Sequence, residues 1–279
     1  MFKKIVVISL FISNIFLHAD DTNNSKSFIE NLSKTEKLAI TNIGIATGVL
    51  TWGFSQWGYG DEDYHWDDEG WFDKTTSNGG SDKLGHFYTN YLTTRIMSPI
   101  YEDWGYTKKE SALYGSLTSI LLSGILIEIG DGYSEHGFSQ QDFIADAFGA
   151  VSGYLWYLNP SLAKKVDFRV EYNPFKKSES KNQTDFTTDY ERMKHLMAIK
   201  ANGFELFEDT PLKYFELHIG YYSRNFNHDS LPVEGRERNI YLGLGVNLSK
   251  LFRPTLGKYS TLFNYVQVPY TYVEGAREF

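Results

Sequence analysis

The sequence predicts an α+β fold, in which an N-terminal four-helix bundle is followed by a C-terminal antiparallel β-meander. Two observations carry this prediction. Between residues 34 and 158, apolar side chains recur at helical spacing behind recognisable helix-start motifs. From residue 215 onward the period becomes two, with an aliphatic side chain at every second position of Ile240–Leu248. We therefore expect a helical domain at residues 20–160 and an antiparallel β region at residues 161–279.

Residues 1–19 have the features of a signal peptide. Lys3 and Lys4 precede an apolar run from Ile5 to Leu17, and Ala19 is a small residue at a suitable cleavage position. An N-terminal anchor helix is the alternative, but the run is short for a membrane span of about 20 residues. We expect export to the bacterial cell envelope, in the periplasm or at the outer membrane.

Four helices are predicted from their start motifs. A Ser or Thr followed three positions later by an acidic residue forms a capping box, which satisfies backbone N–H groups at a helix start. The expected helices run from Ser33 to about Phe54, from near Asp82 to about Met97, from Ala112 to Ile129 and from Gln140 to about Tyr157. Small residues at four-residue spacing on these helices allow close packing, either in a soluble bundle or within lipid.

The period-two segments predict a half-buried antiparallel sheet. Alternation is clearest in Phe215–Tyr222 and Ile240–Leu248, and weaker strands are expected at Val166–Tyr172, His195–Gly203 and Thr261–Tyr272. About five strands fall short of the smallest membrane barrel, which has eight. We therefore favour an open sheet, either packed on the helices or apposed to a membrane, over a complete barrel.

Composition narrows the class of protein. The chain of 279 residues contains no cysteine, which excludes disulfides, thiolate metal sites, cysteine nucleophiles and a cysteine-linked lipid anchor. Its net charge of −8 becomes −10 when the signal peptide removes two lysines, so no nucleic-acid partner is expected. Aromatic residues make up 16% of the chain, and Tyr and Trp gather at membrane interfaces. The expected partner is membrane lipid or another envelope protein.

Three of the predicted helices offer charged side chains from faces that the spacing marks as interior. Asp142, Asp146, Gly149 and Gly153 share one helix face, and the glycines indicate that this face is packed. Buried charges are costly unless they are paired or functional. The predicted candidate catalytic cluster is Lys83, His86, Glu128, Asp131 and Asp142.

This cluster has two interpretations. His86 with acidic partners can bind a divalent metal or act as an acid and base, with Lys83 contacting a phosphate. Alternatively, the cluster is a structural network in which Asp142 serves only the capping box at its helix start. The sequence contains no HExxH, GxSxG or P-loop motif, so the cofactor stays unknown and enzymatic activity stays open. The acidic loop between Trp57 and Lys74 is expected to be solvated rather than a calcium site.

Two motifs carry a resemblance to a known family. The strings DKLGHFYTNYLTTR at Asp82–Arg95 and FSQQDFIADAFGAVSG at Phe138–Gly153, with Glu128 and Asp131 between them, resemble the YfiM-like family of predicted periplasmic or outer-membrane lipoproteins, a domain of unknown function. The stretch Tyr214–Leu248 is similar to the C-terminal part of its longer members. The resemblance implies a cell-envelope protein without an established activity, and the missing cysteine departs from the lipoprotein pattern.

A fainter similarity connects the same helices to VanZ-like membrane proteins, which implies work near a polyprenyl or phospholipid phosphate. The arginine usual before the last motif of that group has no match in Tyr133–Gly137. Together, these features predict an uncharacterised cell-envelope protein with a non-catalytic, membrane-associated structural or interaction role. The alternative is a metal- or lipid-phosphate-binding envelope enzyme that uses the buried His/Glu/Asp cluster.

Overall fold

The computed structural model describes residues 31–176, 186–226 and 232–279. The chain forms two compact units, residues 1–44 and residues 45–279. The predicted signal peptide lies outside the described residues. The helices from α4 onward and the main sheet all belong to the second unit. The predicted domain boundary near residue 160 stays a prediction.

The helix starts follow the predicted motifs. Helix α3 (Lys34–Trp52) begins after Ser33, whose Oγ accepts a hydrogen bond from Glu36 N at 3.3 Å. Thr107 caps α5 (Lys108–Ser119) through a complete capping box with Glu110. Helix α7 (Gln140–Leu158) begins after Ser139. Backbone donors that would otherwise lack partners are thereby satisfied at three helix starts.

Helix α4 (Ser81–Asp103) is longer than its predicted end at Met97 because its last turn is held by packing. Pro99 removes one backbone donor without ending the helix. Beyond it, the fully buried Tyr101 forms a hydrogen bond of 2.8 Å with Thr118 Oγ1 on α5. That contact stabilises the additional turn.

The third predicted helix contains a change of helical type. Helix α5 continues through the π-helical segment η2 (Ile120–Ile125) into α6 (Leu126–Asp131), and a second π-helical turn, η1 (Gly53–Trp57), extends α3. These two continuous segments, Lys34–Trp57 and Lys108–Asp131, are long and apolar enough to cross a membrane.

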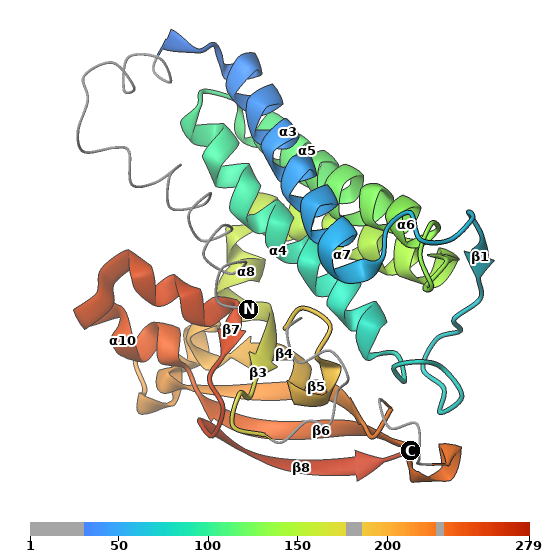
Figure 1. The fold of residues 1–279 in the computed structure, drawn as a ribbon. Coiled ribbons are helices and arrows are strands. Elements are labelled where there is room, and N and C mark those ends of the chain that lie inside the picture. The colour runs from blue at the N-terminus through green and yellow to red at the C-terminus, as the bar shows by residue number, and fades with distance from the viewer. Residues whose placement is uncertain (1–30, 177–185, 227–231) are drawn as a thin grey trace. The chain divides into compact units, whose positions relative to one another are not determined.

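Helix α4 packs against both α5 and α7 (Figure 1). A Cβ atom at Gly149 would lie 2.1 Å from the carbonyl oxygen of Phe87, and one at Gly153 would lie 2.5 Å from Thr94 Cβ. The two glycines of α7 therefore permit its close approach to α4, as their spacing predicts. These contacts join three of the four predicted helices, and the four-helix bundle stays a prediction.

Within the described part of the chain, the sheet has six strands in the order β7-β3-β4-β5-β6-β8. They are β3 (Val166–Tyr172), β4 (Met193–Lys200), β5 (Phe215–Arg224), β6 (Glu237–Val246), β7 (Val266–Gln267) and β8 (Tyr272–Glu278). Neighbouring strands are antiparallel, except that β7 runs parallel to β3. The mixed α+β class is confirmed, and the sheet is open, with β7 and β8 at its edges.

The prediction of a continuous strand at Thr261–Tyr272 is wrong. A 3₁₀ helix, η7 (Gly257–Asn264), occupies its first part, and β7 and β8 flank a break at Pro269 and Tyr270. Proline cannot donate to a sheet, and Tyr270 has a positive φ of 65°. Short helices α9 (Glu205–Glu208) and α10 (Leu248–Leu256) also interrupt the predicted meander, and α8 (Pro160–Lys165) precedes its first strand.

The polar face of the sheet is the buried one. Glu216 and His218 of β5 and Tyr241 of β6 are buried, whereas the alternating aliphatic side chains are exposed. Arg169 Nη1 on β3 reaches Glu216 Oε1 across β4 at 2.6 Å. Lys194 Nζ on β4 reaches Glu274 Oε1 on β8 at 2.5 Å, across two intervening strands. The sheet therefore curls around its charged side chains.

Helices cover the aliphatic side of the sheet at β3. Phe168 lies on this side, and its ring centroid is 4.9 Å from that of Phe87 on α4 and 5.2 Å from that of Trp156 on α7. Ser81 Oγ, at the start of α4, lies 2.7 Å from Ser223 Oγ on β5. The aliphatic side chains of β5, β6 and β8, farther along the sheet from β3, are exposed.

Candidate functional site

A charged cluster lies where α4, α6 and α7 meet. We call it the carboxylate cluster, and it comprises Glu69, Asp82, Lys83, His86, Glu128, Asp142 and Asp146. Close helix packing at Gly149 and Gly153 brings α4 against α7. Four of the five predicted site residues meet here through direct contacts.

Lys83 holds three carboxylates together. Its Nζ lies 2.9 Å from Asp82 Oδ2 and 3.0 Å from Asp142 Oδ2, and it also pairs with Glu69. Only 2% of the side chain is exposed. Burial alone would lower the pKa of Lys83, but Asp82, Asp142 and Glu69 outweigh it and raise the pKa. The ammonium is therefore charged and already surrounded by acceptors.

A short parallel ribbon brings Glu69 to the cluster. Strand β1 (Trp66–Asp67) pairs with β2 (Phe138–Ser139), immediately before α7. The ring centroids of Trp66 and Phe138 are 4.5 Å apart. The other carboxylates of the acidic loop are exposed, as predicted, but Glu69 is not. Burial and the neighbouring Asp142 raise the pKa of Glu69 to about 8.

His86 lies between three carboxylates. Its Nδ1 is 3.2 Å from Asp146 Oδ1 and 3.5 Å from Glu128 Oε1, and its Nε2 is 3.9 Å from Asp142 Oδ1. Burial would lower the pKa of His86, yet Asp142 and Asp146 hold it well above its ordinary value. The side chain is 18% exposed, so solvent reaches the edge of the ring.

Glu128 is the most enclosed acid of the cluster. Its side chain is 1% exposed, and its Oε2 accepts a hydrogen bond of 3.1 Å from Ser139 N. Among the described residues, no hydrogen bond reaches Oε1. Burial raises the pKa of Glu128 to about 9, with His86 opposing and Asp142 adding to the rise. This oxygen therefore faces His86 Nδ1 at 3.5 Å without a hydrogen bond.

Asp146 belongs to the cluster although the predicted set omits it. Asn90 Nδ2 donates to Asp146 Oδ1 at 2.5 Å, and Ser119 Oγ donates to Asn90 Oδ1 at 2.5 Å. Burial raises the pKa of Asp146. Its four-residue spacing from Asp142 is the signal that could have included it.

Asp131 is the predicted residue that lies beside the cluster. Its carboxylate interacts with Tyr59, and burial raises its pKa to about 6. It influences His86 through charge only. Glu69 and Asp82 take its place among the acids in direct contact, and no local motif in the acidic loop marks Glu69.

The cluster has the electrostatics of a cation site. Five carboxylates face two cationic side chains, so the cluster carries an excess of negative charge when all groups are ionised. Ligand atoms of His86, Glu128 and Asp146 lie within 4.8 Å of one another. Those of Glu69, Asp82 and Asp142 do so too, but Lys83 stands among them. The first group is therefore the one that can accept a metal ion.

The fold and this site define a mixed α+β protein that encloses charged side chains in both its helices and its sheet. Residues 68–158 match the model of a family described as predicted periplasmic lipoprotein (DUF2279). The match covers about a third of the chain and includes both motifs of the cluster. It confirms the predicted export to the cell envelope. No curated protein and no solved structure matches the chain.

Proposed function

We propose that the chain is a membrane-associated envelope protein with a structural or interaction role and no catalytic role. The observation that carries this proposal is an inverted distribution of side chains. Soluble proteins bury aliphatic residues and expose charged ones. Here a set of charged residues is enclosed, including Lys83, Glu128 and Arg169, while aliphatic side chains are exposed in contiguous stripes on both the helices and the sheet.

The sheet provides the clearest apolar surface. We call it the aliphatic face, and it consists of Phe215, Leu217, Ile219, Ile240, Leu242, Leu244 and Val273. All seven side chains are exposed, and paired strands place them side by side. Outward aliphatic and inward polar side chains are the pattern of a sheet that faces lipid.

The helices repeat this pattern. Leu113, Leu117 and Leu121 are exposed at four-residue spacing along α5 and η2. Helix α7 exposes a second stripe, Ile144, Phe148, Val151 and Leu155. The opposite face of α7 carries the acids of the cluster. Contiguous apolar stripes of this kind mark a surface that contacts membrane or a partner.

Vesicle flotation tests membrane association. Leu242→Ser/Leu244→Ser removes two side chains from the aliphatic face, and Leu206→Ser/Leu212→Ser removes two exposed leucines outside it. Burial of each leucine contributes about 1.5–3 kcal/mol. We expect the wild type and the second variant to float with zwitterionic phospholipid vesicles, and the first variant to bind at least about tenfold more weakly. A wild type that stays in the soluble fraction would contradict the proposal, as would equal loss in both variants.

We also propose that the similarity extends to the YfiM-like family. The DKLGH and FSQQD motifs both lie within the matched residues 68–158. They supply Lys83, His86 and Asp142 to the cluster. The VanZ-like similarity implies a phosphate ligand, for which Lys83 is the candidate contact. Three carboxylates, however, surround the ammonium group of Lys83. The negative field of the cluster disfavours an anion there.

A second candidate function is metal binding, within an envelope enzyme, at His86, Glu128 and Asp146. Zinc bonds of about 2.0–2.1 Å separate tetrahedral ligands by about 3.3 Å. The spacings of 3.2 and 3.5 Å around His86 Nδ1 fit this geometry. Ser139 N orients Glu128, and Asn90 orients Asp146, as supporting groups do in metal sites. The buried Oε1 of Glu128, which no hydrogen bond reaches among the described residues, is the specific observation that favours this function.

Equilibrium dialysis with Zn²⁺ tests the metal candidate. We expect Glu128→Gln to reduce affinity by at least about tenfold, while Glu135→Gln, an exposed control, leaves it unchanged. Asp82→Asn should retain binding because that carboxylate serves Lys83. A wild type without bound zinc, or Glu128→Gln with unchanged affinity, would leave only the structural network.

A further inference from the structure

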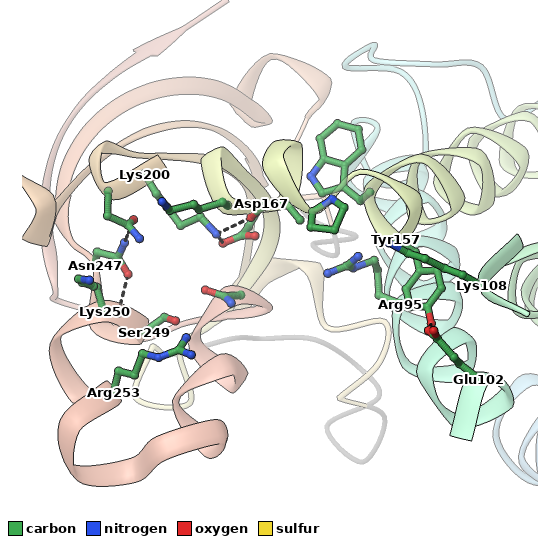
Figure 2. A pocket seen from close by; sticks show the side chains of 16 residues that line it. Arg95, Glu102, Lys108, Tyr157, Asp167, Lys200, Asn247, Ser249, Lys250 and Arg253 are labelled. Carbon is green, nitrogen blue, oxygen red and sulfur yellow. Dashed lines mark hydrogen bonds and ion pairs between the residues drawn. The ribbon is translucent and has the colours of Figure 1, made fainter. Parts of the chain in front are cut away.

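A cavity of about 620 Å³ opens between α10 and the ends of α4 and α7. Figure 2 shows side chains from helices and sheet directed into it. Its basic residues are Arg95, Lys108, Lys164, Lys200, Lys250 and Arg253, against the acids Glu102 and Asp167. We call it the basic cavity. In a chain of net charge −8, such a local excess of positive charge needs an explanation.

Most of this positive charge is unneutralised. Lys200 Nζ pairs with Asp167 Oδ2 at 2.6 Å, and Lys164 pairs with the exposed Glu208 at 3.3 Å. Among the described residues, no ion pair is recorded for the other four cations, Arg95, Lys108, Lys250 and Arg253. The positive electrostatic potential of the cavity therefore favours the binding of an anion.

Two guanidinium groups approach the cavity from different elements. Arg95 enters from α4 and Arg253 from α10, on opposite sides of the open space (Figure 2). Arg95 Nε is buried, and among the described residues it has no hydrogen-bond acceptor. The planar fork of arginine matches the oxygens of a phosphate in bidentate geometry. Arg95 and Arg253 therefore offer two such groups to an oxyanion in the cavity.

The start of α10 adds neutral donors on the same side. Ser249 and Lys250 of its first turn line the cavity. Asn247 Oδ1 accepts the hydrogen bond of Lys250 N at 3.0 Å. The helix has nine residues, and the N–H groups of Leu248 and Ser249 lie in its first turn, where no helical carbonyl can accept from them. The helix dipole also favours an anion there.

The outer surface of α10 indicates where the anion comes from. Leu251, Phe252 and Leu256 are exposed on the helix that also carries Lys250 and Arg253. An amphipathic helix with basic and apolar sides is typical of a membrane interface, at the depth of lipid headgroups.

We propose that the basic cavity is a phosphate-binding site, filled by the headgroup phosphate of an envelope lipid or by a free phosphate. This inference goes beyond the proposed membrane association and does not involve the carboxylate cluster. The sequence suggests a phosphate contact at Lys83, whereas we place the phosphate in the basic cavity. Lys83 is neutralised within the fold, whereas Arg95 and Arg253 have no ion pair among the described residues.

Isothermal titration of the mature chain tests the site with two soluble probes, inorganic phosphate and dihexanoyl phosphatidylglycerol below its micelle concentration. We expect Arg95→Gln and Arg253→Gln each to weaken binding at least tenfold. Arg277→Gln removes an exposed guanidinium at the far end of β8 and should bind as the wild type does. Arg253 is exposed, so its variant is expected to fold, and a thermal melt verifies this.

Preference for the lipid probe over phosphate would identify the headgroup as the source, and equal affinity would identify free phosphate; either supports the site. Failure of both probes to bind the wild type would overturn the proposal. So would equal loss of binding in Arg277→Gln. Flotation of the serine variants measures membrane association separately, so the two proposals can fail independently.

Discussion

His195 shows how strongly the interior of the sheet controls a single side chain. It is buried on β4, and among the described residues neither ring nitrogen has a hydrogen-bond partner. Burial, with a smaller contribution from Arg224, lowers the pKa of His195 to about 3. The ring is therefore neutral at every pH at which the protein is expected to work.

This depressed pKa makes the free energy of unfolding depend on pH. The unfolded state takes up the proton near pH 6.5 and the folded state only near pH 3, so the folded state loses stability as pH falls between these values. The slope from one such group approaches about 1.4 kcal/mol per pH unit. We expect His195→Gln to show a shallower loss of stability over this range than the wild type. Chemical unfolding curves at several pH values measure it, and parallel curves would contradict it.

The contact of α4 with α7 positions the candidate site at the scale of elements. It brings His86 and Asn90 of one helix against Asp142 and Asp146 of the other. The approach depends on Gly149, where any side chain would meet the Phe87 carbonyl. Separation of these helices would widen the distances from Lys83 and His86 to Asp142 and Asp146.

We therefore expect Gly149→Ala to destabilise the fold by about 1–3 kcal/mol through overpacking. Gly275→Ala is the control, since an added Cβ there meets nothing within 4 Å. Thermal or urea unfolding measures both variants. An unchanged midpoint for Gly149→Ala would show that α4 and α7 separate easily.

Start motifs and spacing predicted these elements well, because capping is local chemistry. Thr107 and Ser139 form their caps as expected. The end of α4 could not be predicted, because Tyr101 holds it through a contact with another helix. The role of Glu69 also depends on tertiary structure, since β1 must pair with β2 before Glu69 reaches Lys83.

At the scale of the whole molecule, the second unit carries apolar surfaces on both its helices and its sheet. Alternation in Ile240–Leu248 predicts two different sheet faces, but a period of two does not say which face is enclosed. The structure answers this through ion pairs such as Arg169 with Glu216, which require the polar face inside. On β5 and β6, Tyr221 and Tyr241 are buried, and the exposed face consists of aliphatic residues together with Phe215.

Because the chain contains no cysteine, a single introduced cysteine can report on lipid contact at a chosen position. The most direct measurement places an environment-sensitive fluorophore at Leu242→Cys on the aliphatic face, with Leu206→Cys as the exposed control. With phospholipid vesicles, we predict a blue-shifted emission and quenching by brominated acyl chains at position 242 but not at position 206. Emission at position 242 that remains that of a water-exposed label, unquenched by brominated lipid, would contradict membrane contact through this face.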